Sequence, residues 1–370
     1  MLILKKIHKF KNKIILYGIL IVCAVITVVL VNHDEKFYHN TIAKVITVKE
    51  VPGTSSKADN KKINEQKLTV RILNTDKIGK ILELNNLYTE TGAYDYKFRV
   101  GDKLFLTLTT SSTQELSATI AGVKRDYYLV ITAWIFLVFI ILIGKRKGFL
   151  STLSLLVNII VFYYALELYR NGMNLILLSG ILAIIFTTFS MLMVMGNNKK
   201  SYSAILSTIV ATLFTMIITF LVMIFTQNNG LRFEEMQFIT RPIYPIFMAE
   251  ILLGSLGAIM DIAITISSSM FELHDNNVMT QTALIESGRE IGRDIMGSMC
   301  NVLLLAYVSG SFPMILLYMK NGMPVFNAFY SNLSLELVRA LTGSIGIVLA
   351  IPISIYSTMF FLKKKNELSL

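Results

Sequence analysis

The chain has 370 residues, of which 54% are hydrophobic, a mean hydropathy of +0.60 and a formal net charge of +11. Several apolar runs of about 20 residues exclude a soluble globular enzyme and predict a polytopic α-helical protein of a lipid bilayer. The positive charge is assigned to membrane topology, because no nucleic-acid-binding motif accompanies it. Cys23 and Cys300 lie far apart in apolar runs, so neither a disulfide framework nor a zinc site is predicted.

The first apolar run, Ile14 to Val31, follows a lysine-rich segment at residues 5–13. That charged start resembles a secretory signal peptide, but the apolar part is long and no small-x-small cleavage site follows it. We therefore predict that residues 1–31 form an uncleaved membrane anchor with a cytoplasmic amino terminus.

Residues 32–126 change in character and predict a small extracytoplasmic all-β domain. Polar and apolar residues alternate in Thr41–Val48, Lys67–Leu73 and Lys103–Thr109, and turn signals separate these segments. About five short strands in this length favour an SH3-like or OB-like barrel. Such a barrel binds a peptide or glycan in some proteins and only caps a membrane domain in others, and no cluster of aromatic residues or metal ligands favours binding here.

Residues 127–370 predict a multi-span membrane domain. The predicted spans are, in chain order, Tyr127–Ile143, Phe149–Leu168, Met173–Met195, Tyr202–Thr226, Ile246–Met270, Ile295–Met319 and Glu336–Leu362. With the anchor they make about eight transmembrane helices. Basic clusters at residues 145–147, 199–200 and 363–365 then fall on the side of the amino terminus, so the positive-inside rule predicts that both termini are cytoplasmic.

The span Ile246–Met270 gathers small and polar residues on one face. At helical steps of three or four residues this face carries Glu250, Gly254, Gly257, Asp261, Thr265 and Ser268. The opposite face, which includes Leu256, Ile259 and Ile266, is apolar. A carboxylate at membrane depth costs about 2.5–3.5 kcal/mol on insertion scales and usually faces a bundle interior or a wet cavity. We therefore expect the Asp261 face to look inward.

The next span carries a second polar face, which would line one site in the cytoplasmic half of the membrane if it meets the Asp261 face. Glycines on both helices favour such a close approach. The candidate residues of a substrate or ion pathway are Glu250, Gly254, Gly257, Asp261, Arg293, Asp294, Ser298 and Asn301. No catalytic, cofactor-binding or metal-binding residues are predicted.

Each candidate also has a structural interpretation. Asp261 would then be a buried carboxylate held by a partner such as Asn301, and Arg293 and Asp294 an ordinary ion pair near the membrane surface. The face of the last span that begins at Arg339 is interpreted as a packing face, because most of its members are small.

Two motifs carry a family resemblance. The segment LLGSLGAIMD ends at Asp261, and Ser287-Gly288 and then IGRDIMGSM (Ile291–Met299) precede Asn301. Together they resemble the YibE/F family of bacterial integral membrane proteins, and the β-rich insert after an anchor is similar to the longer, YibE-type members. The resemblance implies a multi-pass protein of the bacterial cell membrane, with a shorter homologous membrane protein or a second copy of the chain as partner.

Two function classes remain open. A transporter or permease component of unknown substrate is favoured, because ion-coupled transport needs a multi-span bundle with a polar face and a membrane carboxylate. The alternative is a non-catalytic scaffold or regulator whose β domain binds an extracytoplasmic partner. An intramembrane hydrolase with Asp261 and Asp294 as a dyad is disfavoured, because the Gly-x-Gly-Asp arrangement is missing and no Ser/His or metal cluster replaces it.

Overall fold

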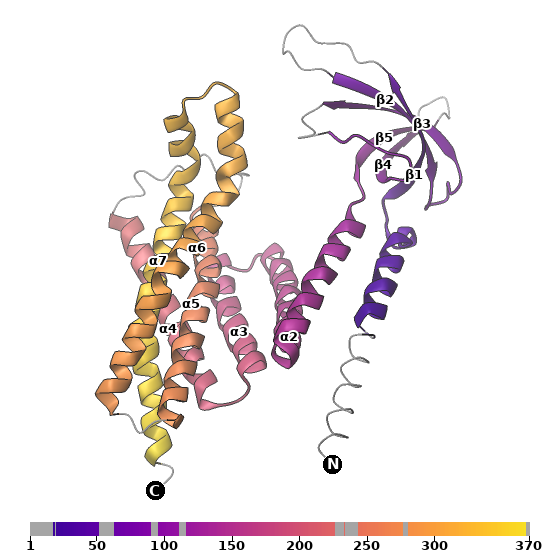
Figure 1. Cartoon of the computed structure of the whole chain (residues 1–370). Helices are drawn as coiled ribbons and strands as arrows, with labels where there is room; N and C mark the ends of the chain where they lie inside the picture. Colours follow the sequence, from indigo (N-terminus) through magenta and orange to yellow (C-terminus); the bar gives the residue numbers. More distant parts are fainter. Residues whose placement is uncertain are drawn as a thin grey trace, which may run out of the picture. The chain divides into compact units, whose positions relative to one another are not determined.

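The computed structural model describes residues 20–51, 63–89, 95–110, 116–225, 243–276 and 280–367, together with Gly18 and Phe233. The chain divides into two compact units, Met1–Ile143 and Gly144–Leu370 (Figure 1). The predicted anchor lies partly outside the described residues, and its described part is an apolar helix, Leu20–Asn32.

The first unit contains a five-stranded antiparallel sheet. A 3₁₀ turn, η1 (Glu35–Phe37), precedes the strands β1 (Thr41–Val51), β2 (Ile63–Ile72), β3 (Ile81–Thr89), β4 (Lys103–Thr110) and β5 (Leu116–Val123). Their order in the sheet is β3-β2-β1-β4-β5. The two end strands, β3 and β5, approach each other, so the sheet curls into a barrel-like shape (Figure 1). The predicted all-β domain is confirmed, whereas its assignment to an SH3-like or OB-like barrel stays a prediction.

Alternate residues of the strands fill the inside of the curled sheet, as the two-residue period of a strand requires. The buried side chains are Ala43, Val45, Leu68, Val70, Leu84, Phe98, Leu104 and Leu106. One polar side chain is buried among them. Gln66 accepts a hydrogen bond from the Phe98 N–H at 3.0 Å and donates to the Phe98 carbonyl at 3.1 Å. This amide therefore holds the irregular segment around Phe98 as a neighbouring strand would.

Charged side chains tie the β domain to the segments that precede and follow it. Lys124 pairs with Asp34 and Asp126, both at 2.8 Å, and Lys103 pairs with Glu35 at 2.6 Å. Burial alone would lower the pKa of Lys124, but its hydrogen bonds to Asp126 and Asp34 raise that pKa above the ordinary lysine value. Burial alone would raise the pKa of Glu35, but the hydrogen bond from Lys103 holds it below the usual value.

Six helices in the described part of the chain are long and apolar enough to cross a membrane. They are α2 (Asp126–Arg170), α3 (Leu175–Met195), α4 (Lys199–Phe225), α5 (Ile243–Asn276), α6 (Gln281–Lys320) and α7 (Val325–Glu367). The predicted spans Tyr127–Ile143 and Phe149–Leu168 both fall in α2, which is broken only at Lys145, with φ 51° and ψ −126°. The predicted total of about eight spans is therefore not confirmed.

The core of the second unit forms around one face of α5. Ile259 and Ile262 are fully buried there, in an apolar cluster shared with α4, α6 and α7. α6 and α7 lie close together at Gly292, where a Cβ atom would collide with Ile351. Small residues allow such close approach between membrane helices.

Four hydroxyl side chains meet inside this bundle, and we name Ser203, Ser267, Ser357 and Thr358 the hydroxyl cluster. Thr358 Oγ1 lies 3.0 Å from Ser203 Oγ and 3.2 Å from Ser267 Oγ, within hydrogen-bond distance of both. Ser357 donates to the Ser203 carbonyl at 3.1 Å. All four side chains are buried. The cluster therefore links α4, α5 and α7 by hydrogen bonds between neutral groups.

Candidate functional site

The Asp261 face of α5 lies at the surface of the single chain. Asp261, Gly254 and Gly257 are exposed, whereas the opposite side, with Leu256 and Ile259, is buried. The prediction that the Asp261 face looks inward is therefore wrong for the single chain. The physical reason is that α3, α4 and α7 all pack on the apolar side of α5, which leaves its charged face outside.

The second polar face, on α6, is also exposed. It carries Arg293, Asp294, Ser298 and Asn301. In the described part of the chain, no side-chain hydrogen bond or ion pair joins Asp261 to Asp294 or to Asn301. Within this chain Asp261 therefore does not form the predicted pair with Asn301 or the disfavoured dyad with Asp294. The two polar faces are not joined into one site by such contacts.

The two helices do approach each other at Gly254. A Cβ atom at Gly254 would collide with the Tyr307 hydroxyl of α6. At Gly257 and Gly297, in contrast, no described side chain or neighbouring helix lies within 4 Å of the Cβ position. Gly254 therefore serves packing inside the chain, whereas Gly257 and Gly297 leave open space on its surface.

A charge cluster, which we define as Glu250 of α5 with Glu336 and Arg339 of α7, joins the first turns of the Asp261 face to a buried arginine. Arg339 donates from Nη1 to Glu336 Oε1 at 2.6 Å and from Nη2 to Glu250 Oε2. Its side chain is only 10% exposed, and its guanidinium lies 5.2 Å from the centre of the Phe247 ring. All three charges thus belong to helices that are apolar enough to cross a membrane.

The charge cluster has unused hydrogen-bonding capacity and unbalanced charge. The Nε atom of Arg339 and the hydroxyl of nearby Tyr307 are buried, and neither has a hydrogen-bond partner among the described residues. A guanidinium stays protonated in proteins. Two ionised carboxylates around one guanidinium therefore leave one excess negative charge, which a bound proton or cation would neutralise.

Sequence reasoning identified one member of this cluster, Glu250, and missed the other two. Arg339 was assigned to a packing face, and its partner on another helix is not visible in the pattern of one span. The spacing Glu336-x-x-Arg339 inside an apolar run is the signal that indicates an ion pair on one helix face. Tyr307 has no comparable signal. Among the described residues, no group of three or more His, Cys, Asp or Glu side chains is arranged to hold a metal ion.

Long apolar helices with charges between them, joined to a separate β domain, define a multi-pass membrane protein. Residues 132–364 match the family model described as YibE/F-like protein, and residues 36–123 match the model of the YibE/F family N-terminal domain. The chain therefore belongs to the YibE/F family, and the resemblance carried by the two sequence motifs is confirmed. Comparisons with curated proteins and with solved structures gave no match.

Proposed function

We propose that the chain is an ion-coupled membrane transporter or permease component, in which the charge cluster and Asp261 carry the coupling ion. The supporting observation is the excess carboxylate around Arg339, inside membrane-type helices. Charged residues within membrane helices are costly and commonly mark ion or substrate pathways. An ion pair kept only for packing would gain nothing from a second, unbalanced carboxylate.

Protonation of the cluster offers a way to link ion binding to a change in packing. With Glu250 and Glu336 both ionised, the cluster is a net anion and favours contact with water. With one carboxylate protonated the cluster is neutral, so closing the bundle around it costs less. The Glu250 side chain is 43% exposed and that of Glu336 is 20% exposed. We therefore assign proton exchange with the surroundings to Glu250.

We further propose a topology, in which the protein crosses the bacterial cell membrane about eight times, with both termini cytoplasmic and residues 32–126 outside. The break in α2 at Lys145 supports this topology, because it falls in the predicted basic turn at residues 145–147. Each part of α2 is then a separate crossing of about 20 residues. The amino-terminal helix Leu20–Asn32 belongs to the remaining one.

Infrared difference spectroscopy tests the transport proposal without a known substrate. Spectra of the purified full-length protein in lipid, recorded at low and at high pH, should contain the C=O stretch of a protonated carboxyl group. The chain has 24 Asp and Glu residues that contribute to this band, so we expect only the component from Glu250 to disappear in Glu250→Gln. The matched control is Glu272→Gln, which removes an exposed carboxylate near the end of α5. A spectrum that Glu250→Gln leaves unchanged would contradict the assignment.

A second function, a scaffold or regulator, is favoured by the exposed polar faces of α5 and α6. An unpaired Asp261 facing hydrocarbon is costly, so a complex with a membrane partner that covers it would be stabilised. We propose a second copy or a shorter homologous membrane protein as this partner, with the β domain binding an extracytoplasmic molecule. Assembly that depends on this face, in a protein whose carboxyl band is unchanged by Glu250→Gln, would favour the scaffold over the transporter.

A further inference from the structure

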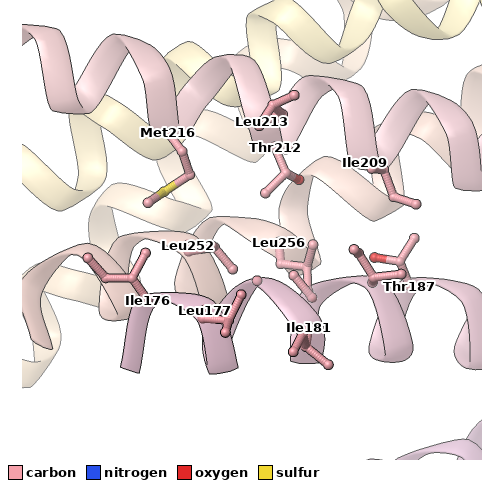
Figure 2. Close-up of a pocket in the computed structure, with 13 residues that line it drawn as sticks. Ile176, Leu177, Ile181, Thr187, Ile209, Thr212, Leu213, Met216, Leu252 and Leu256 are labelled. Atoms are coloured by element: carbon pink, nitrogen blue, oxygen red, sulfur yellow. The ribbon is translucent and has the colours of Figure 1, made fainter. Parts of the chain in front are cut away.

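A partly open apolar groove lies between α3, α4 and α5 (Figure 2). Its volume is about 580 Å³. One wall contains Ile176, Gly180 and Thr187 of α3, and the other contains Thr212 of α4. Leu256 of α5 forms part of the floor. Among the described residues, the lining includes no charged side chain. The groove thus lies in membrane-type helices and is suited to an uncharged, lipophilic occupant.

Two buried hydroxyl groups in the lining have no partner. Thr187 is 0% exposed and Thr212 is 6% exposed, and neither hydroxyl has a hydrogen-bond partner in the described part of the chain. Figure 2 shows the two threonines on opposite walls of the groove. Thr215 on the same helix as Thr212 donates to the carbonyl four residues earlier, at 2.8 Å. Thr152 and Thr208 also lack a partner among the described residues, but only Thr187 and Thr212 line the groove.

We propose that this groove binds a lipophilic carbonyl compound, whose apolar body fills the groove and whose oxygen accepts hydrogen bonds from Thr187 and Thr212. Buried hydroxyl groups without partners are costly, and an acceptor oxygen that enters between the two walls would satisfy them once each threonine side chain turns its hydroxyl toward the groove. A purely hydrocarbon chain would fill the space but leave both hydroxyls unpaired. A partner helix is the alternative occupant, because helical carbonyls do accept a second hydrogen bond from a hydroxyl, as the Ser203 carbonyl does from Ser357, but it would not give the preference for a ketone that is tested below.

Two kinds of variant test the groove. Gly180→Leu should fill it without disturbing the fold, because no described side chain or neighbouring helix lies within 4 Å of the Cβ position at Gly180. Gly310→Leu is the matched control, since Gly310 on α6 has the same open space and does not line the groove. Thr187→Val and Thr212→Val keep the shape of each side chain and remove only the hydroxyl.

The probe is an alkyne-tagged alkyl benzophenone, whose ketone is both the acceptor and the photoreactive group. The full-length protein in lipid nanodiscs is irradiated with the probe, and labelled peptides are located by mass spectrometry. We expect labelling of the peptides that line the groove, loss of this labelling in Gly180→Leu, and no change in Gly310→Leu. Each Thr→Val variant should weaken labelling by about two- to tenfold, the range expected for one net hydrogen bond.

Competition then tests recognition of the oxygen. A long-chain ketone should displace the probe at lower concentration than the alkane of the same length, and the difference should vanish in the Thr187→Val/Thr212→Val variant. Equal competition by ketone and alkane would overturn the proposal, as would groove labelling that Gly180→Leu leaves unchanged. If Gly180→Leu fails to reach the membrane, the shape-preserving threonine variants decide the question, and labelling that they do not reduce would overturn it.

Discussion

The hydroxyl cluster and the Asp261 face both involve polar residues of α5, but the bundle treats them in opposite ways. Ser267 is fully buried and lies in a hydrogen-bonded group with residues of α4 and α7. Asp261 is exposed, and among the described residues its carboxylate has no hydrogen-bond or ion-pair partner. At these two positions α5 therefore buries a neutral group in its own chain and leaves a charged group without a partner at the surface.

This difference distinguishes polar residues that stabilise the fold from polar residues that contribute little to its stability. Neutral hydroxyls satisfy one another inside the bundle at little cost. The charge cluster combines the two cases, because it joins a buried arginine to a carboxylate that is partly exposed. Variants at these three places should therefore rank in a definite order of stability loss.

Replacing Arg339 should have the largest effect. Arg339→Met leaves Glu250 and Glu336 without their cation, and breaking a buried ion pair typically costs about 3–5 kcal/mol. Because Glu250 is partly exposed, we expect the lower end of that range in thermal unfolding of the detergent-purified protein. Adding Glu250→Gln and Glu336→Gln to Arg339→Met should restore much of the loss. Without such recovery, packing on Phe247 and not charge would be the main role of Arg339.

The hydroxyl cluster should follow. Thr358→Val removes the group that contacts both Ser203 and Ser267, so we expect a loss of about 1–3 kcal/mol in the same unfolding measurement. Ser344→Ala is the control, because the Ser344 hydroxyl bonds only to its own helix, at the Ala340 carbonyl. A Thr358→Val protein as stable as the control would show that the cluster does not hold the bundle together.

Asp261 variants should have little effect on stability and a large effect on function. Asp261→Asn and Asp261→Leu should each change the free energy of unfolding by less than about 0.5 kcal/mol, because Asp261 has no hydrogen-bond or ion-pair partner to lose among the described residues. If Asp261 carries the coupling ion, Asp261→Asn should still abolish ion-coupled flux in proteoliposomes. Full flux in this variant would end the ion-pathway role of Asp261. A stability loss equal to that of Thr358→Val would remove the contrast between the two regions.

The variant Gly257→Leu tests whether a partner protein covers the Asp261 face. The added side chain meets no described group within its own chain, so the unfolding temperature should be unchanged. If a partner packs on this face, assembly measured by native mass spectrometry in detergent should be reduced. Gly310→Leu should leave assembly intact. Equal assembly of both variants would mean that the Asp261 face is not the interface.

The smallest effects are expected at the ion pairs of the β domain, outside the membrane. The pKa of Glu35 is lowered on folding, so its contribution is present above its unfolded value near 4.5 and is lost as pH falls through the folded pKa. The pKa of Lys124 is raised, so its contribution is present below about 10.5 and is lost as pH rises through the folded pKa. Lys103→Met should reduce the loss of unfolding free energy at acid pH. Lys124→Met should reduce the corresponding loss at alkaline pH. Unfolding is followed by the fluorescence of Trp134, whose indole N–H donates to Thr27 at 2.6 Å. A pH dependence of stability that neither variant changes would contradict both assignments.

Periodicity in the sequence was enough to predict the two faces of α5 but not their direction. The three- and four-residue steps show which residues share a face with Asp261, because that depends only on helical geometry. Which face is buried depends on the surfaces that other helices offer. α4 and α7 offer small and hydroxyl side chains such as Ser203 and Thr358, and these accept the apolar and serine-bearing side of α5.

The same limit explains the other differences. Alternation predicted the strands of the β domain, but the order β3-β2-β1-β4-β5 depends on pairings between distant segments. The Arg339–Glu250 contact joins residues on two helices far apart in sequence, so no local pattern contains it. α7 begins at Val325, before the predicted start of the span at Glu336, because Asn and Ser side chains lower the mean hydropathy of its first turns.

The contacts of α2 with α3 also constrain how the length of this protein can vary. Ser154 and Asn158, one turn apart on α2, both donate to Ser190 of α3, at 2.9 and 2.8 Å. A loop absorbs an inserted or deleted residue by changing its path, but inside a helix one residue more or less turns all that follows by about 100° around the axis. An insertion or deletion between Ser154 and Asn158 would therefore leave only one of them facing Ser190, and it should be rejected even where the identity of the neighbouring side chains is free to drift.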